Sequence, residues 1–141
     1  MSGRDFHDFT KLIVWQRAET LAVDIYRVTD APPWRASMGL RGQLRNAIGS
    51  IAANIAEGAR AGTRPEFARF LGIAIASASE SQSHLSFAKR LTLINADAYD
   101  GLASETVEVC RMLIGLQRWV RAEHERDKKQ RGATTTRRRT S

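Results

Sequence analysis

The 141-residue sequence has a single cysteine, three prolines and no long apolar run. One thiol, Cys110, can form neither an internal disulfide nor a site with several thiolate ligands, so we expect a cytoplasmic protein. No stretch approaches the ~18 to 20 apolar residues of a membrane-spanning helix. Asp5 and Asp8 lie where a signal peptide would be basic and then apolar. We therefore expect neither export nor a membrane partner.

Patterns for catalysis and cofactor binding are also missing. The chain has no phosphate-binding loop and no dinucleotide fingerprint. A di-iron bundle needs two Glu-x-x-His motifs, whereas this chain offers Glu80 and His84 at i, i+4 and no second copy. His7 and His124 lie far from His84 in the sequence, without metal-ligand spacing. We expect no enzymatic activity, no metal and no cofactor, and we interpret Cys110 as a small core residue rather than a nucleophile.

The net charge of +7 is concentrated at the C-terminus. Residues 126–141 contain seven basic residues and one acidic residue, a net +6, which leaves +1 for residues 1–125. This segment has no large apolar residue, so we predict a flexible basic tail that attracts polyanions or only aids solubility. The residues of this tail that could contact nucleic acid are Lys128, Lys129, Arg131, Arg137, Arg138 and Arg139.

A second locally basic stretch lies between residues 35 and 69. Within it, Arg41 and Arg45 are spaced i, i+4 and would share one helix face. Such a face suits contact with a phosphate backbone or with an acidic surface of another subunit, and a solvated face is the alternative. The candidate nucleic-acid-binding arginines of this stretch are Arg41, Arg45, Arg60, Arg64 and Arg69.

Apolar residues recur with a spacing of three and four in four segments, and no segment has the alternation of a strand. The pattern predicts helices over residues 12–30, 37–58, 64–91 and 97–120. We interpret Ser37, Asp97 and either Thr63 or Arg64 as N-caps, and Gly58 as a left-handed helix stop. Pro65 falls in a first helical turn, where its missing amide hydrogen is harmless.

Four helices with short connections pack most simply as an antiparallel up-down-up-down bundle. We expect an N-terminal arm at residues 1–10, the bundle at residues 11–125 and the tail at residues 126–141. Gly49 lies in the middle of a predicted helix, where it indicates close approach of another helix. Some apolar side chains exceed what one bundle needs, so we expect self-association. These side chains are Trp15, Phe87, Leu93 and Trp119.

The run QLRNAIGSIAANIAEG at residues 43–58 resembles the hallmark of the four-helix-bundle proteins encoded in 23S rRNA intervening sequences. LIVWQRAETLAVDIY at residues 12–26 and EFARFL at residues 66–71 are similar to that family's first and third helices, and the resemblance covers residues 6 to about 121. It implies a ring-like homopentamer, similar to the accessory variability protein of diversity-generating retroelements, which binds nucleic acid and a reverse transcriptase. The family motif comprises Asn54, Ile55, Ala56, Glu57 and Gly58.

Two functions follow from these features. The first is a non-enzymatic, oligomeric protein that associates with RNA or another nucleic acid through its arginine-rich surfaces and basic tail. The alternative is a scaffold that binds a protein partner and has no physiological nucleic-acid ligand. Asn54 and Glu57 either contact RNA or a partner, or satisfy backbone groups at the end of their helix.

Overall fold

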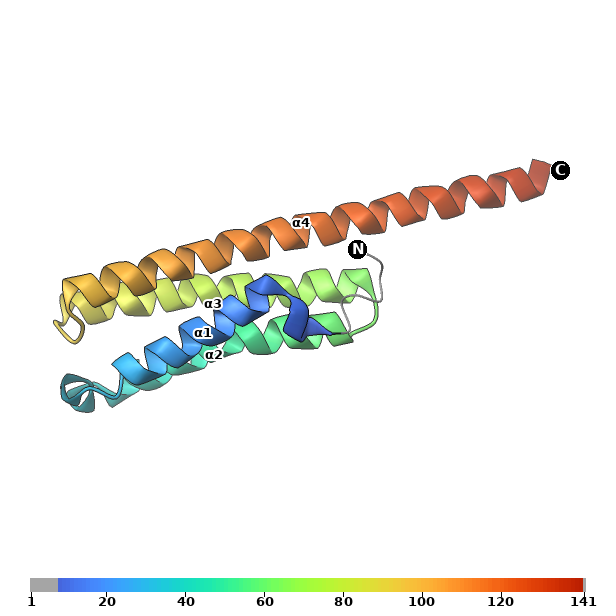
Figure 1. Cartoon of the computed structure of the whole chain (residues 1–141). Helices are drawn as coiled ribbons and strands as arrows, with labels where there is room; N and C mark the ends of the chain where they lie inside the picture. The colour runs from blue at the N-terminus through green and yellow to red at the C-terminus, as the bar shows by residue number, and fades with distance from the viewer. Residues whose placement is uncertain (1–7, 141) are drawn as a thin grey trace.

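The structure is a computed structural model that describes residues 8–140, and all of its regular elements are helical. The α-helices are α1 (Ile13–Val28), α2 (Met38–Arg60), α3 (Arg64–Arg90) and α4 (Ala96–Thr140), and the short 3-10 segments are η1 (Phe9–Lys11) and η2 (Pro32–Ala36) (Figure 1). Over residues 8–140 there is no strand. The prediction of an all-α chain with four main helices is therefore confirmed.

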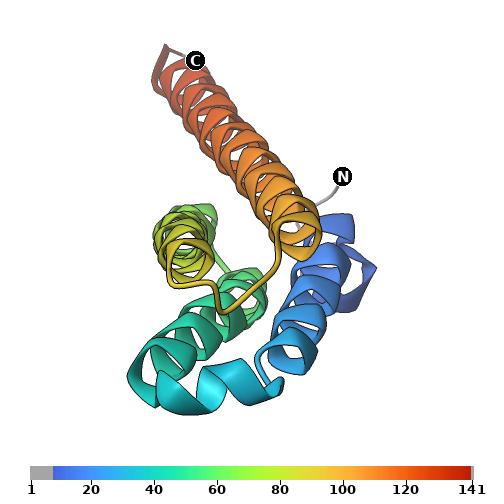
Figure 2. The same ribbon diagram turned by 90° about the vertical axis from the view of Figure 1, so that its left-hand side faces the viewer.

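The four helices surround a common core in chain order. α1 packs on α2 and α4, and α3 packs on α2 and α4, with the most extensive packing between α2 and α3 and between α3 and α4 (Figure 2). Each α-helix runs in the opposite direction to the one before it (Figure 1). Between α1 and α4, Arg17 donates two hydrogen bonds of 2.8 Å to the carboxylate of Glu105. This bidentate pair fixes the register of the first helix against the last.

The core is built from apolar side chains that recur every three or four residues, as the sequence pattern predicts. Fully burying a leucine or isoleucine side chain stabilises a fold by roughly 1.5 to 3 kcal/mol. Trp34 of η2 is also completely buried, although the sequence places it only in a connection. The largest buried side chains are Leu21, Ile25, Trp34, Leu44, Ile48, Ile51, Ile55, Leu71, Leu85, Val109, Leu113 and Val120.

Small residues in the middle of α3 form much of its buried face. Ala74, Ala78 and Ser81 have no exposed surface, so this segment packs closely against its neighbours. The hydroxyls of Ser77 and Ser50 lie 2.9 Å apart and join α3 to α2. Small side chains thus let the two helices approach, and their hydroxyls remain hydrogen-bonded.

Gly58 does not end its helix, and the predicted left-handed stop there is wrong. α2 continues to Arg60, and the glycine with positive φ is Gly62, at 83°. A Cβ atom at position 58 would lie 2.8 Å from Cβ of Phe70 and 2.9 Å from Cδ1 of Phe67. Glycine is therefore required at this position because α3 approaches α2 closely.

Gly49 has the opposite surroundings. A Cβ atom there would meet nothing within 4 Å, so no helix of the same chain approaches this glycine closely. The predicted close approach at Gly49 is therefore not made within the described part of the chain.

Ser37 and Thr63 occupy the N-cap positions predicted for them, although only Thr63 caps through its side chain, and the cap of α4 differs from the prediction. Thr63 precedes α3, and its Oγ1 accepts a 3.3 Å hydrogen bond from the amide of Glu66, as a capping threonine does. The cap of α4 is Asn95 rather than Asp97, because Asn95 Oδ1 accepts from the amide of Ala98 at 2.8 Å. Ser37 precedes α2 but its side chain makes no capping hydrogen bond.

The end of α4 differs from the predicted flexible tail. Residues 126–140 are helical and continue α4 well beyond the ends of the other helices (Figure 1). Val120 is the last buried residue of α4. Starting a helix is costly, whereas adding a residue to an existing one is not, so a charged segment can remain helical when a packed helix precedes it. The boundary predicted at residue 125 is therefore not a change of conformation.

The predicted N-terminal arm lies partly outside the described residues, which begin at Asp8. Its last residues pack on the bundle, since the Phe9 ring lies 5.2 Å from that of Trp15 in an edge-on arrangement. Of the apolar side chains predicted to be in surplus, Phe87 is 54% exposed, whereas Trp15, Leu93 and Trp119 pack partly against the core. No helix within residues 8–140 combines the length and apolarity needed to cross a membrane.

The contact at Gly58 leads to a stability prediction. We expect Gly58→Ala to lower the free energy of unfolding by about 1 to 3 kcal/mol, because the added methyl group overlaps Phe67 and Phe70. Gly115→Ala is the control: nothing lies within 4 Å of a Cβ there, and alanine favours a helix by up to about 1 kcal/mol. Urea denaturation of both variants checks this. Equal stability of the two would contradict the assigned contact.

Candidate nucleic-acid interface

The candidate arginines of residues 35–69 fall at two ends of the bundle. Arg41 and Arg45 lie in the first turns of α2, beside the connection from α1. Arg60, Arg64 and Arg69 lie around the turn from α2 to α3, at the end from which α4 projects (Figure 1). The structure therefore does not bring the five arginines together into one surface.

Arg41 and Arg45 bind the end of α1. Both donate to Asp30 Oδ1, at 2.9 and 3.1 Å. Arg45 also donates to Thr29 Oγ1 at 2.8 Å and to the carbonyl of Tyr26 at 2.9 Å, and its guanidinium carbon lies 4.5 Å from the centre of the Tyr26 ring. A phosphate that bound Arg45 would have to replace several of these contacts. The two residues thus serve the connection between α1 and α2.

Arg60 and Arg69 have partners of their own. The guanidinium carbon of Arg60 lies 4.9 Å from the centre of the Phe9 ring. Arg69 donates to both carboxylate oxygens of Glu66, at 3.1 and 3.0 Å, and lies over the ring of Phe70. These hydrogen bonds lower the pKa of Glu66 and raise that of Arg69. Both arginines are exposed, so phosphate can reach them while these contacts persist.

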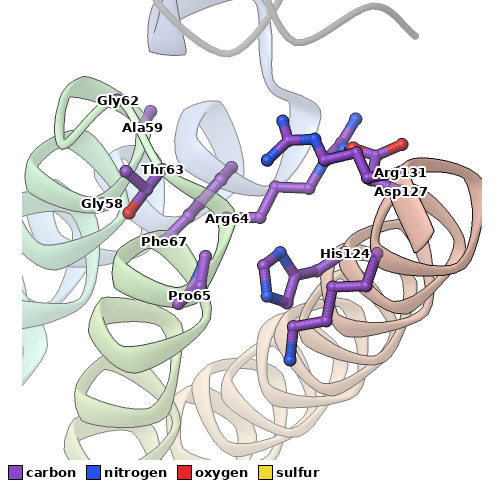
Figure 3. A pocket seen from close by; sticks show the side chains of 11 residues that line it. Gly58, Ala59, Gly62, Thr63, Arg64, Pro65, Phe67, His124, Asp127 and Arg131 are labelled. Carbon is purple, nitrogen blue, oxygen red and sulfur yellow. The ribbon is translucent and has the colours of Figure 1, made fainter. Parts of the chain in front are cut away.

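A cavity of about 590 Å³ lies between the α2–α3 turn and α4 (Figure 3). Arg64 enters it from the first turn of α3, and Lys128 and Arg131 come from α4, more than sixty residues later in the chain. Arg64 forms an ion pair with Asp127, the one carboxylate in the lining. We call this the basic cavity. Its lining residues are Gly58, Ala59, Gly62, Thr63, Arg64, Pro65, Phe67, His124, Asp127, Lys128 and Arg131.

Two titratable residues of the lining, His124 and Asp127, are not among the site residues predicted from the sequence. In the sequence His124 has no partner at metal-ligand spacing, and Asp127 is the one acidic residue of the basic tail. The signal that could have found them is helical spacing beyond residue 125. Positions 127 and 128 lie three and four residues after position 124 and four and three residues before position 131, so the four share one face of a continuous helix.

The remaining candidates of the tail lie outside the basic cavity. These residues are exposed on the projecting part of α4. Arg126 pairs with Glu123, and Lys128 Nζ lies 3.5 Å from Glu125. The helix therefore carries cations both where it leaves the bundle, beside the basic cavity, and along its projecting turns. The outer candidates are Lys129, Arg137, Arg138 and Arg139.

The motif residues support the packing of α2. Asn54 Nδ2 donates at 2.8 Å to both the carbonyl and the hydroxyl of Ser50, so its partners lie within α2 rather than at the helix end. Ile55 is completely buried and Gly58 contacts α3. Ala56 is half-buried, and Glu57 is exposed and remains available to a partner molecule.

Other reactive side chains do not assemble into a site. Between residues 8 and 140, no group of three or more His, Cys, Asp or Glu side chains could hold a metal ion. His84 Nε2 lies 3.2 Å from Glu80 on the same helix. Cys110 is half-buried, and burial raises the pKa of its thiol.

Residues 10–115 match the family of 23S rRNA-intervening sequence proteins, which is 106 of the 141 residues. The chain belongs to this family. The match confirms the resemblance predicted from residues 43–58. It includes α1, α2, α3 and the first part of α4, and it ends before His124. The α4 half of the basic cavity thus lies outside the part of the chain that matches the family.

A solved structure has the same fold. It is a crystal structure of a protein with unknown function from the S23 ribosomal protein family of Bacteroides thetaiotaomicron, similar to this chain with a TM-score of 0.70 and 24% identity. The alignment covers 75% of this chain and 96% of the chain in that structure. Among curated protein sequences, none matches significantly.

The contacts of Arg45 lead to a second prediction. We expect Arg45→Ala to lower the free energy of unfolding by about 1 to 3 kcal/mol, because it removes hydrogen bonds and a cation–π contact of a side chain that is only 19% exposed. Arg35→Ala removes the same charge from an exposed position in η2 and should change stability by less than about 0.5 kcal/mol. Thermal and urea unfolding compare the two. If Arg45→Ala lowered the free energy of unfolding no more than Arg35→Ala does, the structural role of Arg45 would be contradicted.

The raised pKa of Cys110 predicts that its thiol reacts slowly with alkylating reagents. At pH 8 less of the buried thiol is ionised than in an unfolded chain, so iodoacetamide should alkylate the native protein several-fold more slowly than the urea-unfolded protein. Mass spectrometry of timed samples measures both rates. A native rate equal to the unfolded rate would contradict this environment for Cys110.

Proposed function

We propose that this protein associates with RNA in the cytoplasm, without catalysing a reaction on it, through the basic cavity and the projecting part of α4. The observation that carries the proposal is the meeting of Arg64, Lys128 and Arg131 in one cavity at the root of a helix that carries further cations. The family's description, which names an intervening sequence of 23S rRNA, supports RNA as the polyanion.

The projecting part of α4 suits contact with several phosphates. Residues 126–140 form a helix about 20 Å long at 1.5 Å per residue, which is comparable to the spacing of several nucleotides. Arginine and lysine side chains contact phosphate oxygens without reading base sequence. We therefore propose binding that has little sequence preference and a strong dependence on salt.

An oligomer would multiply these contacts. We propose that the protein forms a homo-oligomer, a ring-like homopentamer by the family resemblance, in which several basic cavities and α4 ends act on one RNA. Support comes from Ile73 and Phe87 of α3, which are 39% and 54% exposed, and from its C-cap residue Leu91, which is 44% exposed. Such apolar side chains are typical of surfaces that bind another protein.

The same exposed side chains favour a second candidate, a scaffold for a protein partner. In that case the cations of α4 only keep the protein soluble, and nucleic acid has no role. Affinity for RNA at low salt distinguishes the two candidate functions, because a scaffold should bind RNA weakly even under that condition.

Charge removal from the end of α4 tests the proposal. We expect the Gln variant of Arg137, Arg138 and Arg139 to bind single-stranded RNA more weakly, and the slope of log K against log salt to become shallower by about 2, since each lost phosphate contact removes about 0.7. Fluorescence anisotropy with a labelled RNA over a salt series measures both quantities.

The matched control removes three charges from the opposite end of the bundle. Arg27, Arg35 and Arg90 are exposed near the ends of α1, η2 and α3, and their triple Gln variant has the same net charge. It should retain nearly the wild-type slope. Equal effects of the two variants would show binding that is not localised on α4, and wild-type protein that ignores RNA at low salt would favour the scaffold.

A further inference from the structure

We propose that the basic cavity binds a phosphomonoester, the terminal phosphate of an RNA strand or of a mononucleotide. This inference rests on the proposed function and specifies the group that its central site recognises. It differs from general contact with the RNA backbone, because a phosphate inside a strand is a diester and carries a single negative charge.

The charge of the lining matches a dianion. Arg64, Lys128 and Arg131 contribute three positive formal charges to the lining, and Asp127 contributes one negative charge, so these four residues carry a net +2. Glu125, 3.5 Å from Lys128, lies outside the lining, and because both side chains of this pair are more than 60% exposed, water screens its charge. A phosphomonoester carries about −1.5 to −2 at pH 7. A phosphodiester would leave part of this positive charge uncompensated. The cavity therefore favours the end of a strand over its interior.

The lining also contains a hydrogen-bond donor that has no acceptor among the described residues. Arg64 pairs with Asp127, yet its Nε is buried and has no hydrogen-bond partner among residues 8–140. Unpaired donors of this kind are costly, and a phosphate oxygen is a strong acceptor for a guanidinium. A bound phosphate would share Arg64 with Asp127 or displace it. Because Asp127 is 41% exposed, water can hydrate the displaced carboxylate.

The side chains rather than the start of α3 would hold the phosphate. Pro65 has no amide hydrogen, and the amides of Glu66 and Phe67 donate to the side chain and the carbonyl of Thr63. In Figure 3 Arg64 reaches across from α3 toward Asp127 and Arg131 of α4, with His124 one turn away. The phosphate would thus bridge the two helices.

The volume leaves room for more than phosphate. About 590 Å³ is within the range of small-molecule sites, so the sugar attached to the phosphate can also enter. A strand end and a free mononucleotide share this chemistry, and the experiment distinguishes them.

The test compares three forms of one short RNA, with a 5′-phosphate, with a 3′-phosphate, or with hydroxyls at both ends. We expect the wild-type protein to prefer one phosphorylated form over the hydroxyl form by about tenfold, the change that 1.4 kcal/mol produces in an equilibrium constant. Equal affinity for all three would overturn the inference while leaving the proposed function intact. Failure of all three to bind would instead overturn the proposed function.

Two neighbouring lysines supply the matched control. Lys128 lines the cavity, whereas Lys129 lies outside it, and each Gln variant removes one charge from the same turn of α4. Lys128→Gln should reduce the preference for the phosphorylated RNA to within about twofold, and Lys129→Gln should retain it. A preference that both variants keep, or that both lose, would show a general charge effect and would contradict the cavity as the site.

Competition identifies the source of the phosphate. A mononucleotide with the favoured terminal phosphate should displace the phosphorylated RNA from the wild-type protein but should not affect the binding of hydroxyl-ended RNA. Displacement at micromolar nucleotide would indicate that a free mononucleotide is itself a ligand, and displacement only at millimolar nucleotide would indicate the RNA end. No displacement at any concentration would contradict a phosphomonoester site.

Discussion

The close approach of α3 to α2 at Gly58 determines where the basic cavity can form. Phe67 and Phe70 lie where any side chain at position 58 would be, so α3 begins directly against the last turns of α2. The chain reverses over three residues, 61–63, with Gly62 at a φ of 83°. This short turn places Arg64 opposite α4. A bulkier residue at position 58 would move α3 outward and with it one wall of the cavity.

The length of α4 supplies the other wall. Packing against α1 and α3 orders this helix as far as Val120, and each later residue needs only to continue a helix that already exists. Asp127 then pairs with Arg64, which ties the segment just beyond the packed region to the start of α3. Cations that would have no defined position in a flexible tail are thereby held at fixed places relative to the bundle.

The sequence predicts features that depend on residues nearby in the chain. It does not predict the role of a residue when that role depends on a helix distant in the sequence. Helical periodicity locates the four helices, and Thr63 and Pro65 mark the start of α3 through contacts within one turn. Gly58 is different, because a glycine near a helix end suits both a left-handed stop and a close contact. Only the position of α3 distinguishes these roles. The pairing of Arg64 with Asp127, 63 residues apart, has no local signal at all.

The arginines also show why a count of positive residues does not locate a phosphate site. Arg45 has a hydroxyl, a carbonyl, a carboxylate and an aromatic ring as partners, so binding phosphate there would exchange contacts for little net gain. In the basic cavity three cations face one lining carboxylate, Asp127, which is partly exposed and can be hydrated when displaced, and the second carboxylate nearby, Glu125, is exposed outside the lining. A phosphate there gains charge-assisted contacts without leaving a buried acceptor unpaired. Affinity for phosphate therefore depends on the local surplus of cations over their own partners, and that surplus is set by packing.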